Sequence, residues 1–113
     1  MKLYGACIGT HHLEPMVNFY RKVFGCEPYV DGPDHRFLEA QLIVFDMTGF
    51  EADTDTLSAK NSMIYAVDDV DLEFARLKSL GIAGNPPTDK PWGVRSFGIQ
   101  DPDGNFINFF TNL

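Results

Sequence analysis

Few side chains in this sequence could carry acid–base, metal or nucleophilic chemistry. There are three histidines, an adjacent pair at His11 and His12 and a third at His35, and two cysteines, Cys7 and Cys26. Histidine titrates near neutral pH and binds metals, and a cysteine becomes a nucleophile when its pKa is lowered. The sequence shows no base partner for Cys7, so we expect a small buried apolar residue there. We expect the histidines on the surface, with an adventitious metal at the pair and a general base at His35 as alternatives.

Length and charge exclude several classes of protein. The 113 residues make less than one typical domain of about 150, and a 44% hydrophobic composition can fill a core. Nine basic against sixteen acidic residues give a net charge of −7, which argues against a nucleic-acid or anionic membrane partner. Two cysteines make no disulfide framework, and no apolar run approaches the roughly 20 residues of a membrane span. We therefore expect a cytoplasmic protein.

The two halves of the chain repeat one order of elements. A helix is predicted from about Pro15 to Phe24, ending at Gly25, and another from about Val70 to Leu80, ending at Gly81. An apolar run precedes each helix, and short strands follow it; those that the pattern locates are 36–39, 42–47, 94–100 and 105–111. Each half therefore reads as a βαβββ module. We expect modules at 1–48 and 62–113, with a polar, acidic linker at 49–61, in a single domain spanning 1–113.

Several motifs occur together in this frame. Asn18 to Gly25 reads NFYRKVFG, Val67 to Asp71 reads VDDVD, and Pro91 to Phe97 reads PWGVRSF, followed by DPDGN at 101–105. In this order and spacing the sequence resembles the vicinal oxygen chelate superfamily of glyoxalases, bleomycin-resistance proteins and dioxygenases. The resemblance implies an α+β fold in which the two modules form a half-barrel mixed sheet around a cleft, with the helices on the convex side.

In metal-dependent members of that family the ligands come from the first, fourth, fifth and eighth strands. The matching positions here are Gly5, one of the apolar residues at 43–45, Ser62 and Asn108. A divalent ion in such a site needs about three nitrogen or oxygen donors, and these residues offer one hydroxyl and one amide. We therefore expect no metal, no cofactor and no catalytic residue, and a protein that is more readily a binder than an enzyme.

The family's metal positions also mark the concave face of the sheet, and alternation along the strands extends that face. We expect this concave face to carry mostly small side chains, with a few aromatic ones. Trp92, in a Pro-Trp-Gly segment, would border it as a stacking surface or else bury its ring against the other module. The predicted ligand-binding residues are Cys7, Phe45, Ser62, Ile64, Trp92, Ser96, Phe106, Asn108 and Phe110.

These observations favour a metal-independent protein that sequesters a small molecule, as in the antibiotic-resistance branch of the family. The resemblance also implies a homodimer. Eight acidic residues between Asp46 and Glu73 would favour an aromatic, cationic ligand, although such residues also serve solubility. One alternative is a lyase or dioxygenase with displaced ligands among His11, His12, His35 and Glu39. Another is a regulatory or vestigial dimeric interaction module.

Overall fold

The computed structural model describes residues 1–48, 60–82 and 84–113. Most of the predicted linker, at residues 49–59, lies outside the described residues. The chain divides into two compact units, Met1–Lys60 and Asn61–Leu113, which are described separately here. Each unit follows the order strand, helix and three strands, so the predicted α+β fold with two βαβββ repeats is confirmed.

The described residues of the first unit form one helix and a four-stranded mixed sheet. Its elements are β1 (Ala6–Thr10), α1 (Leu13–Phe24), β2 (Tyr29–Asp31), β3 (Asp34–Phe37) and β4 (Leu42–Asp46). The spatial order is β1-β4-β3-β2, with β1 and β4 parallel and the other neighbours antiparallel.

The second unit repeats this topology. Its elements are β5 (Ser62–Ala66), α3 (Val70–Ser79), β6 (Thr88–Asp89), β7 (Val94–Gln100) and β8 (Phe106–Asn112). The order is β5-β8-β7-β6, and again the first and last strands of the unit are parallel. The sequence pattern did not locate β2 and β6, because two or three residues are too short to show an alternation.

Helix α1 packs on its sheet through a stripe of apolar residues. Met16, Val17, Tyr20 and Val23 are buried, and Gly25 ends the helix in the left-handed conformation with φ 67°. The helix begins at Leu13, two residues before the predicted start. His12 stands at the N-cap position, but its side chain makes no capping hydrogen bond.

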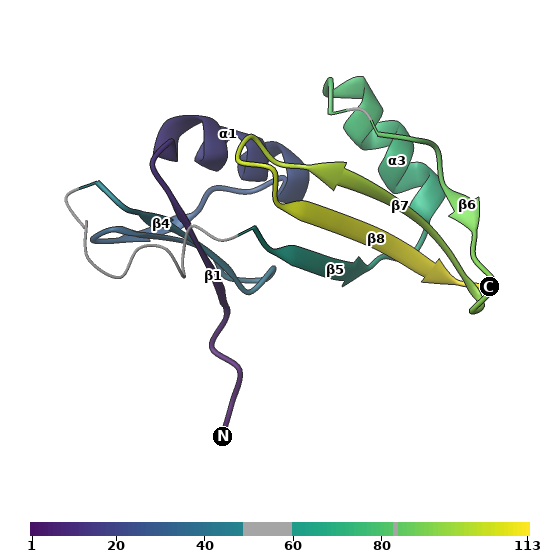
Figure 1. Ribbon diagram of the computed structural model, residues 1–113, viewed down its shortest axis with the longest axis horizontal. Coiled ribbons are helices and arrows are strands. Elements are labelled where there is room, and N and C mark those ends of the chain that lie inside the picture. The colour runs from purple at the N-terminus through teal and green to yellow at the C-terminus, as the bar shows by residue number, and fades with distance from the viewer. Residues whose placement is uncertain (49–59, 83) are drawn as a thin grey trace. The chain divides into compact units, whose positions relative to one another are not determined.

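Helix α3 lies along one face of the second sheet, against β7 and β8 (Figure 1). Asp69 caps its N-terminus by accepting hydrogen bonds from the backbone N–H groups of Asp71 and Leu72, at 3.0 and 3.1 Å. Phe74 then packs edge-on against Phe97, with ring centroids 5.3 Å apart. Leu80, expected in the apolar stripe, follows the helix and is exposed.

The turn between β7 and β8 is held by one buried carboxylate. Asp101 accepts hydrogen bonds from the backbone N–H groups of Asp103 and Asn105, both at 2.9 Å, and from the Asn105 side-chain amide at 2.8 Å. The Asn105 Oδ1 in turn accepts a hydrogen bond from the N–H of Asn61 at 2.8 Å. This network fixes the start of β8 against the chain that enters β5.

We predict that Asp101→Ala lowers the free energy of unfolding by about 2–3 kcal/mol, because it leaves buried donors of Asn105 without an acceptor. Asp69→Ala, which removes only an exposed cap, should cost about 1 kcal/mol. Urea denaturation followed by circular dichroism measures both values. Equal losses in the two variants would contradict a structural role for the buried carboxylate.

Candidate functional site

The two faces of the second sheet differ because α3 covers only one of them. Met63, Phe97, Ile99, Ile107 and Phe109 are buried on the helix side. The opposite face, here called the pocket face, holds the alternate residues, and strand pairing places Ile64 beside Asn108 and Ser96 beside Phe110. The register puts six of the predicted residues on the pocket face, together with Ala66 and Gly98: Ser62, Ile64, Ser96, Phe106, Asn108 and Phe110.

A pocket of about 430 Å³ lies on the pocket face. Its lining is mostly apolar, with a few polar groups, as is usual for small-molecule sites. Five of the predicted ligand-binding residues line it, and two further residues were not predicted. The lining comprises Ile64, Lys90, Trp92, Val94, Ser96, Asn108 and Phe110.

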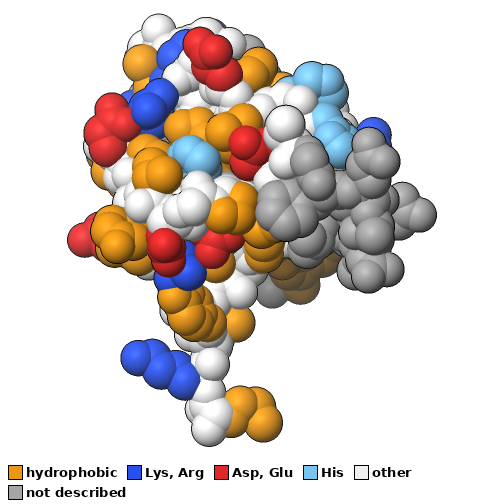
Figure 2. Space-filling model, turned by 90° about the vertical axis from the view of Figure 1, so that its left-hand side faces the viewer, with side chains coloured by type: hydrophobic (Ala, Val, Ile, Leu, Met, Phe, Trp, Pro, Cys, Tyr) orange, Lys and Arg blue, Asp and Glu red, His pale blue; other side chains and the backbone are white. Residues whose placement is uncertain are grey.

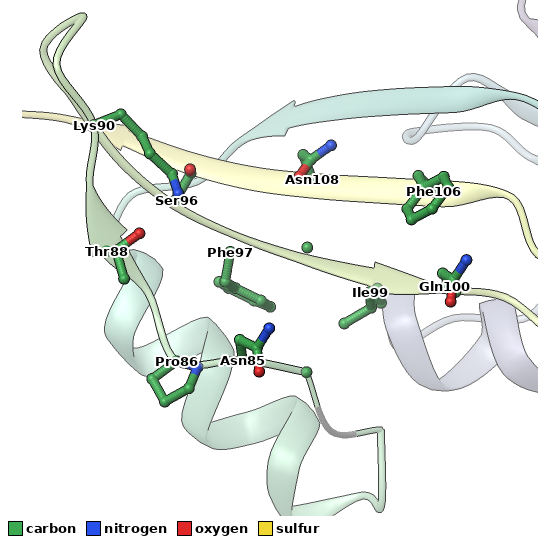
Figure 3. Close-up of a pocket in the computed structure, with 12 residues that line it drawn as sticks. Asn85, Pro86, Thr88, Lys90, Ser96, Phe97, Ile99, Gln100, Phe106 and Asn108 are labelled. Carbon is green, nitrogen blue, oxygen red and sulfur yellow. The ribbon is translucent and has the colours of Figure 1, made fainter.

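A second pocket, of about 790 Å³, adjoins the edge of β7 and shares Lys90, Ser96 and Asn108 with the first. Figure 3 shows the segment of Asn85 and Pro86 beside this edge, and Phe106 on β8. The segment approaches β7 very closely, since a Cβ at Gly84 would lie 2.4 Å from the carbonyl oxygen of Gly98. Only glycine therefore fits at position 84 in this arrangement.

A tight hairpin loop positions Trp92 and Lys90. The backbone N–H of Lys90 donates to the carbonyl of Val94 at 2.7 Å, and that of Gly93 donates to the carbonyl of Lys90 at 3.1 Å. Gly93 has φ 87°, as the last position of a three-residue hairpin loop requires. Trp92 stands at this loop with 73% of its surface exposed.

Sequence reasoning missed Lys90 and Val94. Val94 is the first residue of β7, and alternation from Ser96 could have found it. Lys90 directly follows β6, whose two residues show no periodicity in the sequence. Only the pairing of Thr88 with Ser96 fixes the face to which Lys90 belongs.

The remaining predicted residues, Cys7, Phe45 and Ser62, line neither pocket; Ser62 lies in the second unit, and Cys7 and Phe45 lie in the first. Cys7 pairs with Ile43 and Gly9 with Phe45, so both predicted residues lie on the face of that sheet opposite α1. On the same face Arg36 lies over the Tyr4 ring at 4.7 Å and pairs with Asp34 at 3.1 Å.

On the face drawn in Figure 2, basic and acidic side chains lie among hydrophobic ones and form no continuous basic patch.

The residues at the family's metal positions do not fit a divalent ion. Ser62 and Asn108 are neutral, Gly5 has no side-chain donor, and the fourth-strand position falls among apolar residues at 43–45. Within residues 1–48, 60–82 and 84–113, no group of three or more histidine, cysteine or acidic side chains could hold a metal. The displaced ligands considered in the sequence, His11, His12, His35 and Glu39, therefore form no such group either.

The imidazole of His35 lies near Asp46. Hydrogen bonds from Thr48 lower the pKa of the Asp46 carboxyl, and smaller contributions come from the charges of His35 and His11. The Nδ1 atom of His35 also lies 3.4 Å from the carbonyl oxygen of Pro33. These contacts give His35 a structural setting at the start of β3 and do not place it in either pocket.

Comparison with known proteins agrees with the fold and the motifs. The profile of the Glyoxalase/Bleomycin resistance protein/Dioxygenase superfamily matches residues 5–109, so the chain belongs to this superfamily. A search of curated proteins finds no match. No helix in the described part of the chain is long and apolar enough to cross a membrane.

Solved structures with the same fold include proteins of different activities. A glyoxalase/bleomycin resistance protein/dioxygenase from Nocardioides is 25% identical, with a TM-score of 0.81 over 100% of this chain and 84% of that one. TnmS3, an antibiotic binding protein from Streptomyces sp. CB03234, is 24% identical (TM-score 0.76; 100% and 97% covered). A lactoylglutathione lyase from Agrobacterium tumefaciens is 22% identical (TM-score 0.76; 97% and 92% covered).

Burial raises the pKa of the Cys7 thiol, and the charge of Asp34 raises it further. A raised pKa leaves less thiolate at a given pH, and the thiolate is the species that reacts. We predict that iodoacetamide at pH 8 alkylates exposed Cys26 well before half-buried Cys7, and that raising the pH accelerates the reaction of Cys7. Peptide mass spectrometry over time measures both rates. Faster alkylation of Cys7 would identify an activated thiol instead.

We also predict that the purified chain retains no stoichiometric divalent ion after treatment with a chelator, dialysis and re-exposure to Zn²⁺, Ni²⁺, Mn²⁺ or Fe²⁺. The reason is that the family positions lack anionic and imidazole donors. Elemental analysis per mole of chain is the measurement. One tightly held ion per chain, lost in Ser62→Ala or Asn108→Ala, would show that a metal site exists after all.

Proposed function

We propose that this protein binds a small aromatic molecule without covalent chemistry and so sequesters it, as a metal-independent member of its superfamily. The observation that carries the proposal is the pocket of about 430 Å³ on the pocket face, where Trp92, Ile64 and Phe110 surround two polar side chains, Ser96 and Asn108. Apolar walls with a few polar groups supply affinity and orientation for a ligand of this kind. The second unit alone builds this pocket.

Exposed apolar surface supports the same proposal. Trp92 and Ile64 are 73% and 69% exposed, and Phe106 is also exposed on this face. Soluble proteins rarely leave adjoining large apolar side chains uncovered unless they bind something. A planar ring stacked on Trp92 would remove this surface from water and gain the stacking energy of aromatic pairs.

An enzyme is the second candidate, because a lactoylglutathione lyase has a similar structure and the superfamily is named in part for glyoxalases and dioxygenases. The donor set argues against it, since the metal positions hold Gly5, Ser62 and Asn108. The antibiotic binding protein TnmS3 offers a precedent for binding in this fold. A dimeric interaction module is the third candidate. Homodimerisation and a role in antibiotic resistance belong to the proposal as implications of the family resemblance, and a cytoplasmic location belongs to it as an expectation from the low cysteine content.

The acidic stretch between Asp46 and Glu73 was the reason to expect a cationic ligand. Glu51, Asp53 and Asp55 of this stretch lie outside the described residues. No acidic side chain occurs in the described lining of either pocket, and Lys90 occurs in both.

We predict that a screen of phenazines, quinones and bleomycin finds a compound that raises the melting temperature saturably. Trp92→Ala and Phe110→Ala should each weaken its binding about five- to tenfold, because each removes an aromatic surface of the pocket. Equilibrium dialysis gives the dissociation constants without relying on tryptophan fluorescence.

The matched control is Leu72→Ala, which truncates an exposed apolar side chain on α3, outside both pockets. Its affinity should equal that of the unmodified chain. Equal weakening in all three variants would place binding elsewhere. If no compound binds saturably and size-exclusion chromatography instead shows a complex with another protein, the interaction module replaces the proposed binder.

A further inference from the structure

Lys90 is the one charged residue among the described residues that line the two pockets. Figure 3 shows its side chain extending from the chain after β6 toward Ser96. Its ammonium group forms no ion pair with any residue that the structure describes. The chain as a whole is acidic, with a net charge of −7 from sixteen acidic and nine basic residues.

The strand register explains why Lys90 lies on a different face from the acidic residues near it in the sequence. Thr88 pairs with Ser96 on the pocket face, so alternation brings Lys90 to that face and Asp89 to the other. On the helix side Arg95 engages the nearby acids, with its Nη1 3.1 Å from Asp89 Oδ1 and its Nη2 3.1 Å from Asp71 Oδ1. The acid–base network therefore lies against α3, and one positive charge remains on the pocket face.

Building on the small-molecule binding proposed above, we propose that the pocket selects aromatic molecules that carry an anionic group such as a carboxylate. The ring lies against Trp92, Ile64 and Phe110, and the anion lies at the ammonium of Lys90. The amide of Asn108 and the hydroxyl of Ser96 line the same pocket and can donate hydrogen bonds to the anion. The local positive charge, and not the net charge of the chain, thus determines the preference.

Three probes of one shape test this proposal: naphthalene-2-carboxylate, the neutral naphthalene-2-carboxamide and the cationic naphthalen-2-ylmethylamine. Trp92 is the only tryptophan of the chain and lines the pocket, so its fluorescence reports binding directly. Titrations at low ionic strength should show the carboxylate binding about three- to tenfold more tightly than the amide, and the ammonium binding most weakly. Added salt should reduce the difference.

Lys90→Met keeps most of the aliphatic side chain and removes the charge. It should bring the carboxylate to the affinity of the amide while leaving the amide unchanged, and Lys90→Arg should retain the preference. The control Lys78→Met makes the same charge change at an exposed position on α3 and should bind all three probes as the unmodified chain does.

The outcomes separate this inference from the function on which it rests. Equal affinities for the carboxylate and the amide, tighter binding of the ammonium, or an unchanged preference in Lys90→Met would overturn the anionic selectivity and leave aromatic binding intact. Absence of saturable binding by every probe would overturn the proposed function itself.

Discussion

Among the residues that the structure describes, each βαβββ unit has one helix for a four-stranded sheet, and one helix covers one face. This constraint determines the rest of the structure, because side chains alternate between the two faces of a strand. In the second unit the covered face takes Phe97, Ile107 and Phe109 into the core with α3. The other face keeps the alternate residues, and of these Ile64, Ser96, Asn108 and Phe110 line the pocket of about 430 Å³.

The elements that hold this face in place lie at its margins. The buried Asp101 carboxylate fixes the turn between β7 and β8, and Asn105 connects that turn to the start of β5. At the other end of β7 the hairpin loop with Gly93 holds Trp92 and Lys90. The residues that line the first pocket therefore come from strands and a tight hairpin, which position side chains more rigidly than long loops do.

Sequence patterns located most of this arrangement. The apolar stripes and glycine stops gave both helices to within two residues, and the bounds of β7 are those that the alternation predicted. The same alternation assigned Ser96, Asn108 and Phe110 to one face. Alternation could not locate β6, because a strand of two residues shows no periodicity in the sequence. It therefore missed Lys90, whose face is fixed by the pairing of Thr88 with Ser96 on β7. Alternation also could not show that Cys7 and Phe45 line neither pocket, since it assigns residues to a face of a sheet but does not show where on that face a cavity lies.

The family's metal positions lack strong donors, and the pocket face is apolar with one cation, Lys90, among its described lining residues. An amide titration by NMR spectroscopy with naphthalene-2-carboxylate tests the central claim, that the pocket face is the binding surface. The account predicts saturable shifts at Ile64, Ser96, Asn108 and Lys90, with α3 little affected. Shifts concentrated on the outer surface of α3, or only in residues 1–48, would contradict it.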